Sequence, residues 1–145
     1  MRVTGEGGRA RTALALSTLV LSEALVVVAA PAGIAKSGSV VRMSLVEWSL
    51  APKLVTARAG RVSFVVRNDG TMLHEFLVLR SDRHHHKLKV RGGKAVETGR
   101  VGRIPQIPSG ATSRLTLKLP AGKYVLLCNL LGHYQAGQFA ALRVR

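Results

Sequence analysis

The sequence predicts an all-β domain, best described as a two-sheet Greek-key β-sandwich. Short segments alternate apolar and polar residues with a period of two, which is typical of half-buried strands. Turn-forming sequences separate these segments, namely ARAG, RNDG, IPSG and LPAG. No stretch after residue 36 keeps a helical period for three turns. We therefore expect about seven short strands packed in two layers.

Four segments alternate regularly enough to assign an inward face. In RVSFVVR (61–67) that face carries Val62, Phe64 and Val66, and in SRLTLKL (113–119) it carries Leu115, Leu117 and Leu119. In KYVLLC (123–128) it carries Tyr124, Leu126 and Cys128, and in QFAALRV (138–144) it carries Gln138, Ala140, Leu142 and Val144. A fifth strand begins at HEFLVL, where His74 shares the phase of Phe76 and Val78.

Two regions are less regular. The segment VVRMSLVEWSL (40–50) is predicted as one strand whose alternation slips near Leu45, which indicates a bulge or burial on both faces. We interpret Trp48 within it as a core residue, with an electron path as the alternative. The stretch 81–103 is basic, contains glycine and lacks a clear pattern, so we expect a long surface loop with one edge strand at most.

The first 35 residues are predicted to be a secretory signal or an N-terminal membrane anchor, and residues 36–145 the folded domain. A basic start is followed by a mostly apolar stretch that ends in small residues, with Ala32 or Ala35 before the cleavage point. Glu23 favours cleavage, because a carboxylate at the bilayer centre costs about 2.5–3.5 kcal/mol. Either alternative predicts an extracytoplasmic location: periplasmic, secreted or anchored to the outer face of the membrane.

The domain is strongly basic. The chain has 22 Lys and Arg against 7 Asp and Glu, and residues 1–35 account for three arginines and two glutamates, which leaves a formal charge of +14. Such a charge favours an acidic partner or an anionic membrane face. Nucleic acid is disfavoured, because the basic residues are spread along the chain and no RNP or zinc-finger pattern is present.

The most informative stretch is CNLLGHYQAGQ (128–138). It holds the single cysteine of the chain, so no internal disulfide can form. Cys128 ends one strand and Gln138 begins the next with the same inward phase, which predicts that they meet at one end of the core, with His133 on the loop above. His74 is expected to point inward as well. Each residue alone has an ordinary structural interpretation, but one thiolate and two imidazoles on a β-frame are typical of a trigonal His₂Cys copper site.

On these residues the chain resembles the cupredoxin family of small blue copper proteins. The similarity covers roughly residues 40–145 and rests on HEFLVL, on LPAGKYVLLCNLLGHYQAGQ and on FAALRV. The resemblance implies that His74, Cys128 and His133 are equatorial copper ligands. It places Gln138 where the family most often has Met, as in stellacyanin-like members. An oxygen donor favours Cu(II), so a reduction potential below that of a Met version is expected. The alternative is a chain that has lost its copper.

The resemblance also implies a function. We expect a monomeric type 1 copper protein that carries single electrons and is not an enzyme, since copper enzymes of this fold need further copper sites. His133 would form the exposed edge for electron transfer, with Leu130 and Leu131 as a docking patch for an acidic redox partner; association with a membrane surface is a further option. Two alternatives are copper storage or delivery without a redox partner, and an interaction module without metal.

Other residues have supporting interpretations. Asn129 is expected to hydrogen-bond the ligand loops and tune the sulfur, and Gly132 and Gly137 to permit a tight loop. Glu75 is either a buried partner for an arginine or a polar edge residue. The tract His84–His85–His86 is interpreted as a solvated basic loop outside the main site, although such a tract can also collect Cu(II), Ni(II) or Zn(II) loosely.

Overall fold

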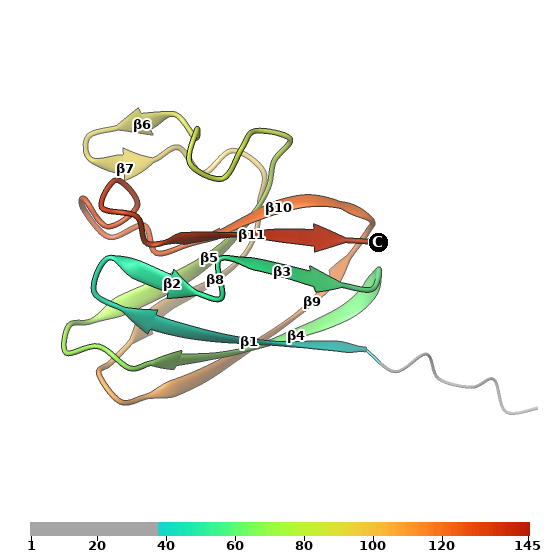
Figure 1. Ribbon diagram of the computed structural model, residues 1–145, viewed down its shortest axis with the longest axis horizontal. Coiled ribbons are helices and arrows are strands. Elements are labelled where there is room, and N and C mark those ends of the chain that lie inside the picture. Colours follow the sequence, from blue (N-terminus) through green and yellow to red (C-terminus); the bar gives the residue numbers. More distant parts are fainter. Residues whose placement is uncertain (1–37) are drawn as a thin grey trace, which may run out of the picture. The chain divides into compact units, whose positions relative to one another are not determined.

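The computed structural model describes residues 38–145, and the predicted signal or anchor (1–35) lies outside the described residues. The described part is a sandwich of two sheets with a separate two-stranded hairpin (Figure 1). Within it, no helix has the length and apolar character needed to span a bilayer. The predicted all-β sandwich is confirmed.

The four-stranded sheet has the order β2-β1-β4-β9. Its strands are β1 (Ser39–Val46), β2 (Ser49–Ala51), β4 (Gly60–Asn68) and β9 (Thr112–Leu119). β1 pairs with β4 in parallel, and the other pairings in this sheet are antiparallel. Because Leu45 lies opposite Asn68, the turns that follow β1 and β4 come to the same end of the sandwich.

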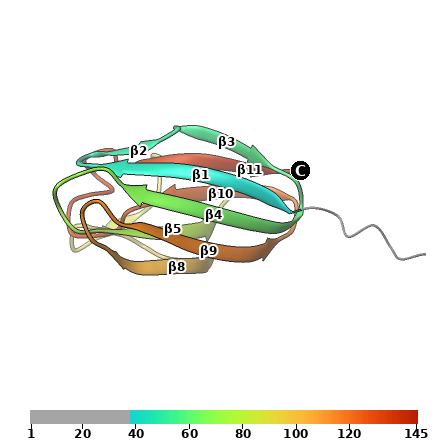
Figure 2. The same ribbon diagram turned by 90° about the horizontal axis from the view of Figure 1, so that it is seen from below.

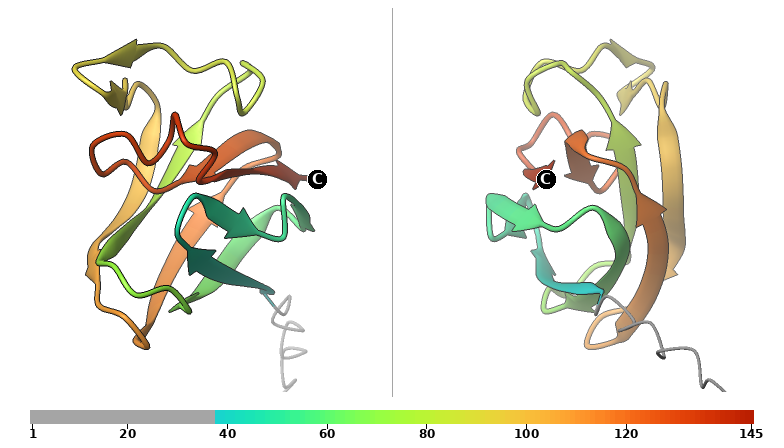
Figure 3. Two further views of the ribbon diagram at one scale, coloured as in Figure 1. Left: turned by 60° about the vertical axis from the view of Figure 1, so that its left-hand side comes forward. Right: turned by 90° about the vertical axis from the view of Figure 1, so that its right-hand side faces the viewer.

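The five-stranded sheet has the order β3-β11-β10-β5-β8 and forms the second layer (Figure 2). Its strands are β3 (Leu54–Ala57), β5 (His74–Arg80), β8 (Arg100–Ile107), β10 (Gly122–Leu127) and β11 (Phe139–Val144). The hairpin of β6 (Val90–Arg91) and β7 (Lys94–Ala95) lies outside both sheets (Figure 3).

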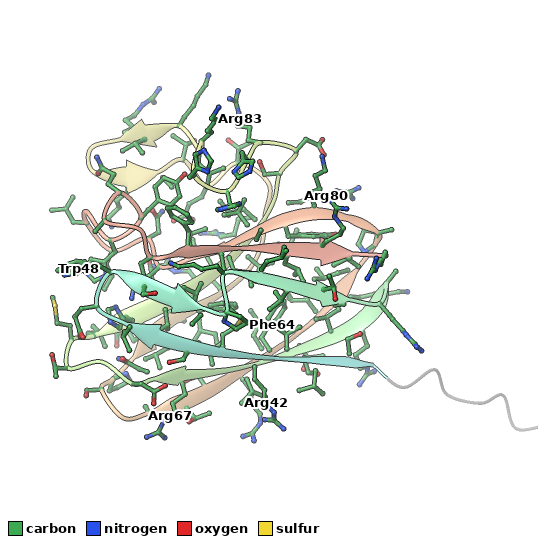
Figure 4. All side chains as sticks on the ribbon, in the orientation of Figure 1. Arg42, Trp48, Phe64, Arg67, Arg80 and Arg83 are labelled. Carbon is green, nitrogen blue, oxygen red and sulfur yellow. The ribbon has the colours of Figure 1, made fainter. Side chains whose placement is uncertain are left out.

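The main core lies between the sheets. Phe64 of β4 and Phe76 of β5 are fully buried with ring centroids 5.4 Å apart, and Figure 4 shows Phe64 between the layers. The inward faces predicted for β4, β10 and β11 are all buried. On β9 the predicted alternation holds, with Leu119 buried and Leu115 and Leu117 half-buried against the core.

A second apolar cluster lies on the outer face of the five-stranded sheet. Side chains of β5 and β10 meet residues of the segments that follow them there, and the buried members are Leu77, Leu79, Ala95, Val125, Leu127 and Tyr134. The expectation of a long surface loop with one edge strand over 81–103 is therefore wrong in part. The segment forms β6, β7 and the start of β8, and its Leu88 and Ala95 cover apolar surface that would otherwise face water.

The prediction of one strand over 40–50 is also wrong. The chain reverses at Glu47 and Trp48, so the segment is a tight hairpin of β1 and β2, and this turn causes the slip in alternation. Trp48 has a left-handed backbone (φ 65°), and its side chain is 50% exposed rather than part of the core. It projects from the same end as the turns after β1 and β4 (Figure 4).

Replacement of the central aromatic side chain tests the core. We expect Phe64→Ala to lower the free energy of unfolding by about 3–5 kcal/mol, because it leaves a cavity beside Phe76. Leu54→Ala, at a side chain that is 66% exposed, should change it by no more than about 0.5 kcal/mol. Urea denaturation of both variants measures the difference, and equal losses would contradict this description of the core.

Candidate metal centre

Three potential metal ligands meet at one end of the sandwich. His74 begins β5, Cys128 follows β10, and His133 lies in the loop between β10 and β11. The Cys128 Sγ lies 3.4 Å from His133 Nδ1 and 3.8 Å from His74 Nδ1, and one donor atom from each residue lies within 4.8 Å of the others. All three side chains are buried. The structure thus brings together the residues that the sequence pattern singled out.

Strand pairing explains this convergence. β10 pairs on one side with β5, where Leu127 lies opposite Leu77, and on the other side with β11. The Cys128 N–H donates to the Gln138 carbonyl (3.0 Å), which closes the loop between them. The loop can turn tightly because Gly132 (φ 79°) and Gly137 (φ 108°) adopt left-handed conformations, as predicted.

Gln138 is fully buried and points its amide into the same group. Its Oε1 lies 2.9 Å from His133 Nδ1, and its Nε2 donates to the Val46 carbonyl (2.7 Å). Nε2 also lies 3.2 Å from His74 Nδ1. A backbone carbonyl can only accept, so the contact with Val46 fixes which end of the amide is the nitrogen. The oxygen is thereby turned toward His133.

A carboxylate lies behind His74. The Glu47 Oε1 accepts hydrogen bonds from the N–H groups of Thr71 (2.7 Å) and Met72 (2.8 Å) and lies 3.7 Å from His74 Nε2. These bonds, that from Met72 above all, lower the pKa of Glu47 to about 2. The negative charge favours a proton on Nε2, which leaves the Nδ1 lone pair of His74 facing both the Gln138 amide nitrogen and the Cys128 sulfur.

Glu47 was missed by the sequence analysis because it lies more than twenty residues from His74 in the chain and belongs to no motif. The one local signal is Gly70. A Cβ at this position would come within 2.5 Å of the Glu47 carboxylate, so a larger residue would displace that carboxylate from its present position. Asn68 supports the same turn, since its side chain donates to the carbonyls of Met72 (2.7 Å) and Ile107 (2.8 Å).

The buried environment sets the ionisation of the donors. Burial, reinforced by the neighbouring His133, lowers the pKa of His74, and Glu47 opposes this shift. Burial raises the pKa of Cys128, although backbone N–H groups of Glu75 and Leu130 partly offset it. The His74 imidazole is therefore neutral at neutral pH, and the buried Cys128 thiol needs a nearby positive charge, such as a metal ion, to become a thiolate.

Glu75 is a buried ion-pair partner, which settles its interpretation. Its carboxylate accepts from Arg103 Nε (3.0 Å) and Nη2, and its N–H lies 3.4 Å from the Cys128 Sγ.

Asn129 has a different role from the one expected. It exchanges hydrogen bonds with the backbone of Ala95 (2.7 and 2.9 Å) and so ties the loop to β7.

The expectation of an exposed His133 is wrong in part. Its side chain is only 4% exposed, because the Trp48 ring covers it edge-on with centroids 5.2 Å apart. Of the expected docking residues, Leu130 is half-buried and Leu131 is 70% exposed. Trp48, not His133, is therefore the aromatic surface at this end. The tract His84–His86 forms a separate group and does not join the main site.

The fold and the site together define a class: a cupredoxin-fold sandwich with a buried His–Cys–His group and a buried glutamine beside it. No protein-family model and no curated protein sequence matches the chain. Solved structures do match.

A dithionite-reduced auracyanin from Roseiflexus castenholzii is 18% identical with a TM-score of 0.61, over 75% of this chain and 98% of that chain. An azurin from Methylomonas sp. strain J is 12% identical (TM-score 0.57, 75% and 99% covered). A methionine-to-glutamine variant of rusticyanin is 21% identical with a TM-score of 0.58, over 75% of this chain and 80% of that chain. The chain therefore has the cupredoxin fold.

The ion pair behind the cysteine gives a stability prediction. We expect Arg103→Met to lower the free energy of unfolding by about 2 kcal/mol, because Glu75 stays buried without its partner. The value lies below the loss for a fully buried pair because the Arg103 side chain is 42% exposed. Arg100→Met is the matched control, because Arg100 lies in the same strand as Arg103 and its pair with Glu97 is more exposed. Adding Glu75→Gln to Arg103→Met should recover part of the loss; no recovery would show that the charge is not its cause.

Proposed function

We propose that this protein binds one copper ion through His74, Cys128 and His133, with Gln138 as a weak fourth ligand, and acts as a one-electron carrier. The observation that carries the proposal is the buried Cys128 sulfur with the Nδ1 atoms of His74 and His133 at 3.8 and 3.4 Å, on a cupredoxin fold.

The donor spacing fits a metal ion. Bond lengths of about 2.0–2.1 Å to nitrogen and about 2.3 Å to sulfur, at angles between tetrahedral and trigonal, separate the two donors by about 3.5–3.8 Å. The two observed nitrogen–sulfur separations are 3.4 and 3.8 Å. The donors therefore need little rearrangement to share one ion.

The donor chemistry selects copper. A soft thiolate with two imidazoles suits both copper oxidation states, and the bound ion would supply the one-electron change. The chain's own contribution is a rigid frame. Strand pairing fixes Cys128, the charge of Glu47 favours the His74 tautomer with its proton on Nε2, and burial keeps water away from the donors. Donors that are held in place in this way change their positions little between the Cu(I) and Cu(II) states.

The surface at this end suits contact with another protein. Apolar side chains from three turns are exposed here or nearby: Trp48, Met72, Leu73 and Leu131. We propose that electrons pass through His133 and Trp48, with Leu130 and Leu131 in the docking patch. The basic remainder of the surface would steer an acidic redox partner, and such steering weakens with salt. An extracytoplasmic monomer, with contact to a membrane surface as a further option, completes the proposal.

Copper storage or delivery is the second candidate function. The observation that favours it is the second histidine group, His84–His86, which lies outside the main site. Electron self-exchange distinguishes the two functions. Fast exchange between oxidised and reduced protein supports the carrier, whereas slow exchange with ready transfer of copper to a chelator supports delivery.

The first test is a visible spectrum of the full-length protein after addition of one equivalent of Cu(II). We expect an intense thiolate-to-copper absorption that Cys128→Ser abolishes completely, because the sulfur is its source. His84→Ala/His86→Ala is the matched control and should leave the band unchanged. A colourless protein, or a band that survives Cys128→Ser, would rule out the proposed site.

The second test concerns the fourth ligand. Gln138→Met replaces an oxygen donor with a thioether and should raise the reduction potential, because the softer donor favours Cu(I). Cyclic voltammetry measures the shift. Gln138→Leu, which has no donor atom, separates ligation from burial. An unchanged potential in both variants would show that Gln138 is not a ligand.

A further inference from the structure

The histidine tract is a compact group in the structure, although consecutive strand residues would point to opposite sides. The chain turns at this point, with the Lys87 N–H donating to the His84 carbonyl (2.8 Å). The three rings therefore project from one turn. Their centroids lie 4.3 Å (His84–His85), 4.1 Å (His84–His86) and 5.4 Å (His85–His86) apart. One ring nitrogen from each lies within 4.8 Å of the others.

The turn is anchored to the rest of the protein. The Tyr134 hydroxyl donates to the His85 carbonyl (2.9 Å) and accepts from the Leu88 N–H (2.9 Å). The His85 ring packs against Phe139, with centroids 5.3 Å apart. A backbone that is fixed before binding loses less conformational entropy when a ligand binds than a free histidine tract would.

We propose that His84, His85 and His86 form a second metal site, for a divalent ion that prefers imidazole ligands, such as Cu²⁺, Ni²⁺ or Zn²⁺. A tetrahedral ion with bonds of about 2.0–2.1 Å needs its nitrogens about 3.3 Å apart. In the structure these nitrogens lie within 4.8 Å of one another. Rotation of the exposed rings of His84 and His86 can bring them to the shorter separation, while His85 stays against Phe139. The site shares no ligand with the copper site proposed above.

The surrounding charges act in two directions. Burial, the neighbouring histidines and Lys53 lower the pKa of His85, so its ring keeps a free lone pair at neutral pH. Arg83 and Lys87 flank the tract in the chain, and Figure 4 shows Arg83 on the outer side of the molecule. These cations repel a metal ion, so added salt should strengthen binding by screening them.

The position of the site links it to the main centre. Tyr134 follows His133, and Phe139 follows Gln138, so the residues that hold the tract are direct neighbours of two donors. Their rings also pack on each other, with centroids 5.2 Å apart. A metal ion on the tract would therefore brace the outer side of the loop that carries Cys128 and His133.

The test removes the thiolate site first. In full-length Cys128→Ser, Cu²⁺ is titrated and followed by electron paramagnetic resonance, and His84→Ala/His86→Ala is then added to that background. Loss of a group that only hydrogen-bonds a metal ligand costs a site about 10–100-fold in affinity. Loss of two direct ligands should therefore weaken Cu²⁺ binding at least about 100-fold. It should also remove the hyperfine coupling of the copper to the His84 and His86 nitrogens. Lys87→Ala, in the same turn, is the matched control and should bind as tightly or more tightly.

Two outcomes would overturn the proposal. One is equal Cu²⁺ affinity with and without His84 and His86, which would place the bound ion elsewhere, for example on the remaining histidines of the main site. The other is the absence of Cu²⁺ binding in Cys128→Ser although the parent protein forms the thiolate band, which would leave the proposed function intact and exclude the second site.

Discussion

The position of β10 between β5 and β11 is the constraint on which the rest of the structure depends. The strand is buried on both faces, with Leu126 in the main core and Leu127 in the outer cluster. Its pairing on both sides fixes where it ends, and the residue after its end is Cys128. A shift by one residue would turn every side chain of the strand to the opposite face. Burial on two faces therefore specifies the position of the sulfur.

The remaining donors are held by contacts between distant segments. Gln138 bonds to Val46 in β1, and Glu47 bonds to the turn before His74. The β1–β2 turn belongs to the four-stranded sheet, and it supports His74 and Gln138 from that side. Cys128 and His133 come from the loop after β10 in the other sheet. Since the two sheets pack through one core, the geometry of the site and the stability of the sandwich are coupled.

Much of this arrangement could be predicted from sequence. Alternation identified the inward faces of β4, β9, β10 and β11, and phase and spacing brought out His74, Cys128, His133 and Gln138. Contacts without a local pattern could not be predicted. The turn at Glu47 has neither glycine nor proline, so the hairpin looked like one strand and Trp48 like a core residue. The cover formed by Leu88 and Ala95 depends on two short strands that are too brief to show a period.

The exposed position of Trp48 has a practical consequence. It is the single tryptophan of the chain, and its ring lies against that of His133. Indole emission responds to the polarity and the electronic state of its immediate surroundings. The protein therefore carries an intrinsic fluorophore at its candidate metal centre. Changes at His133 can be followed by tryptophan fluorescence without attaching a dye.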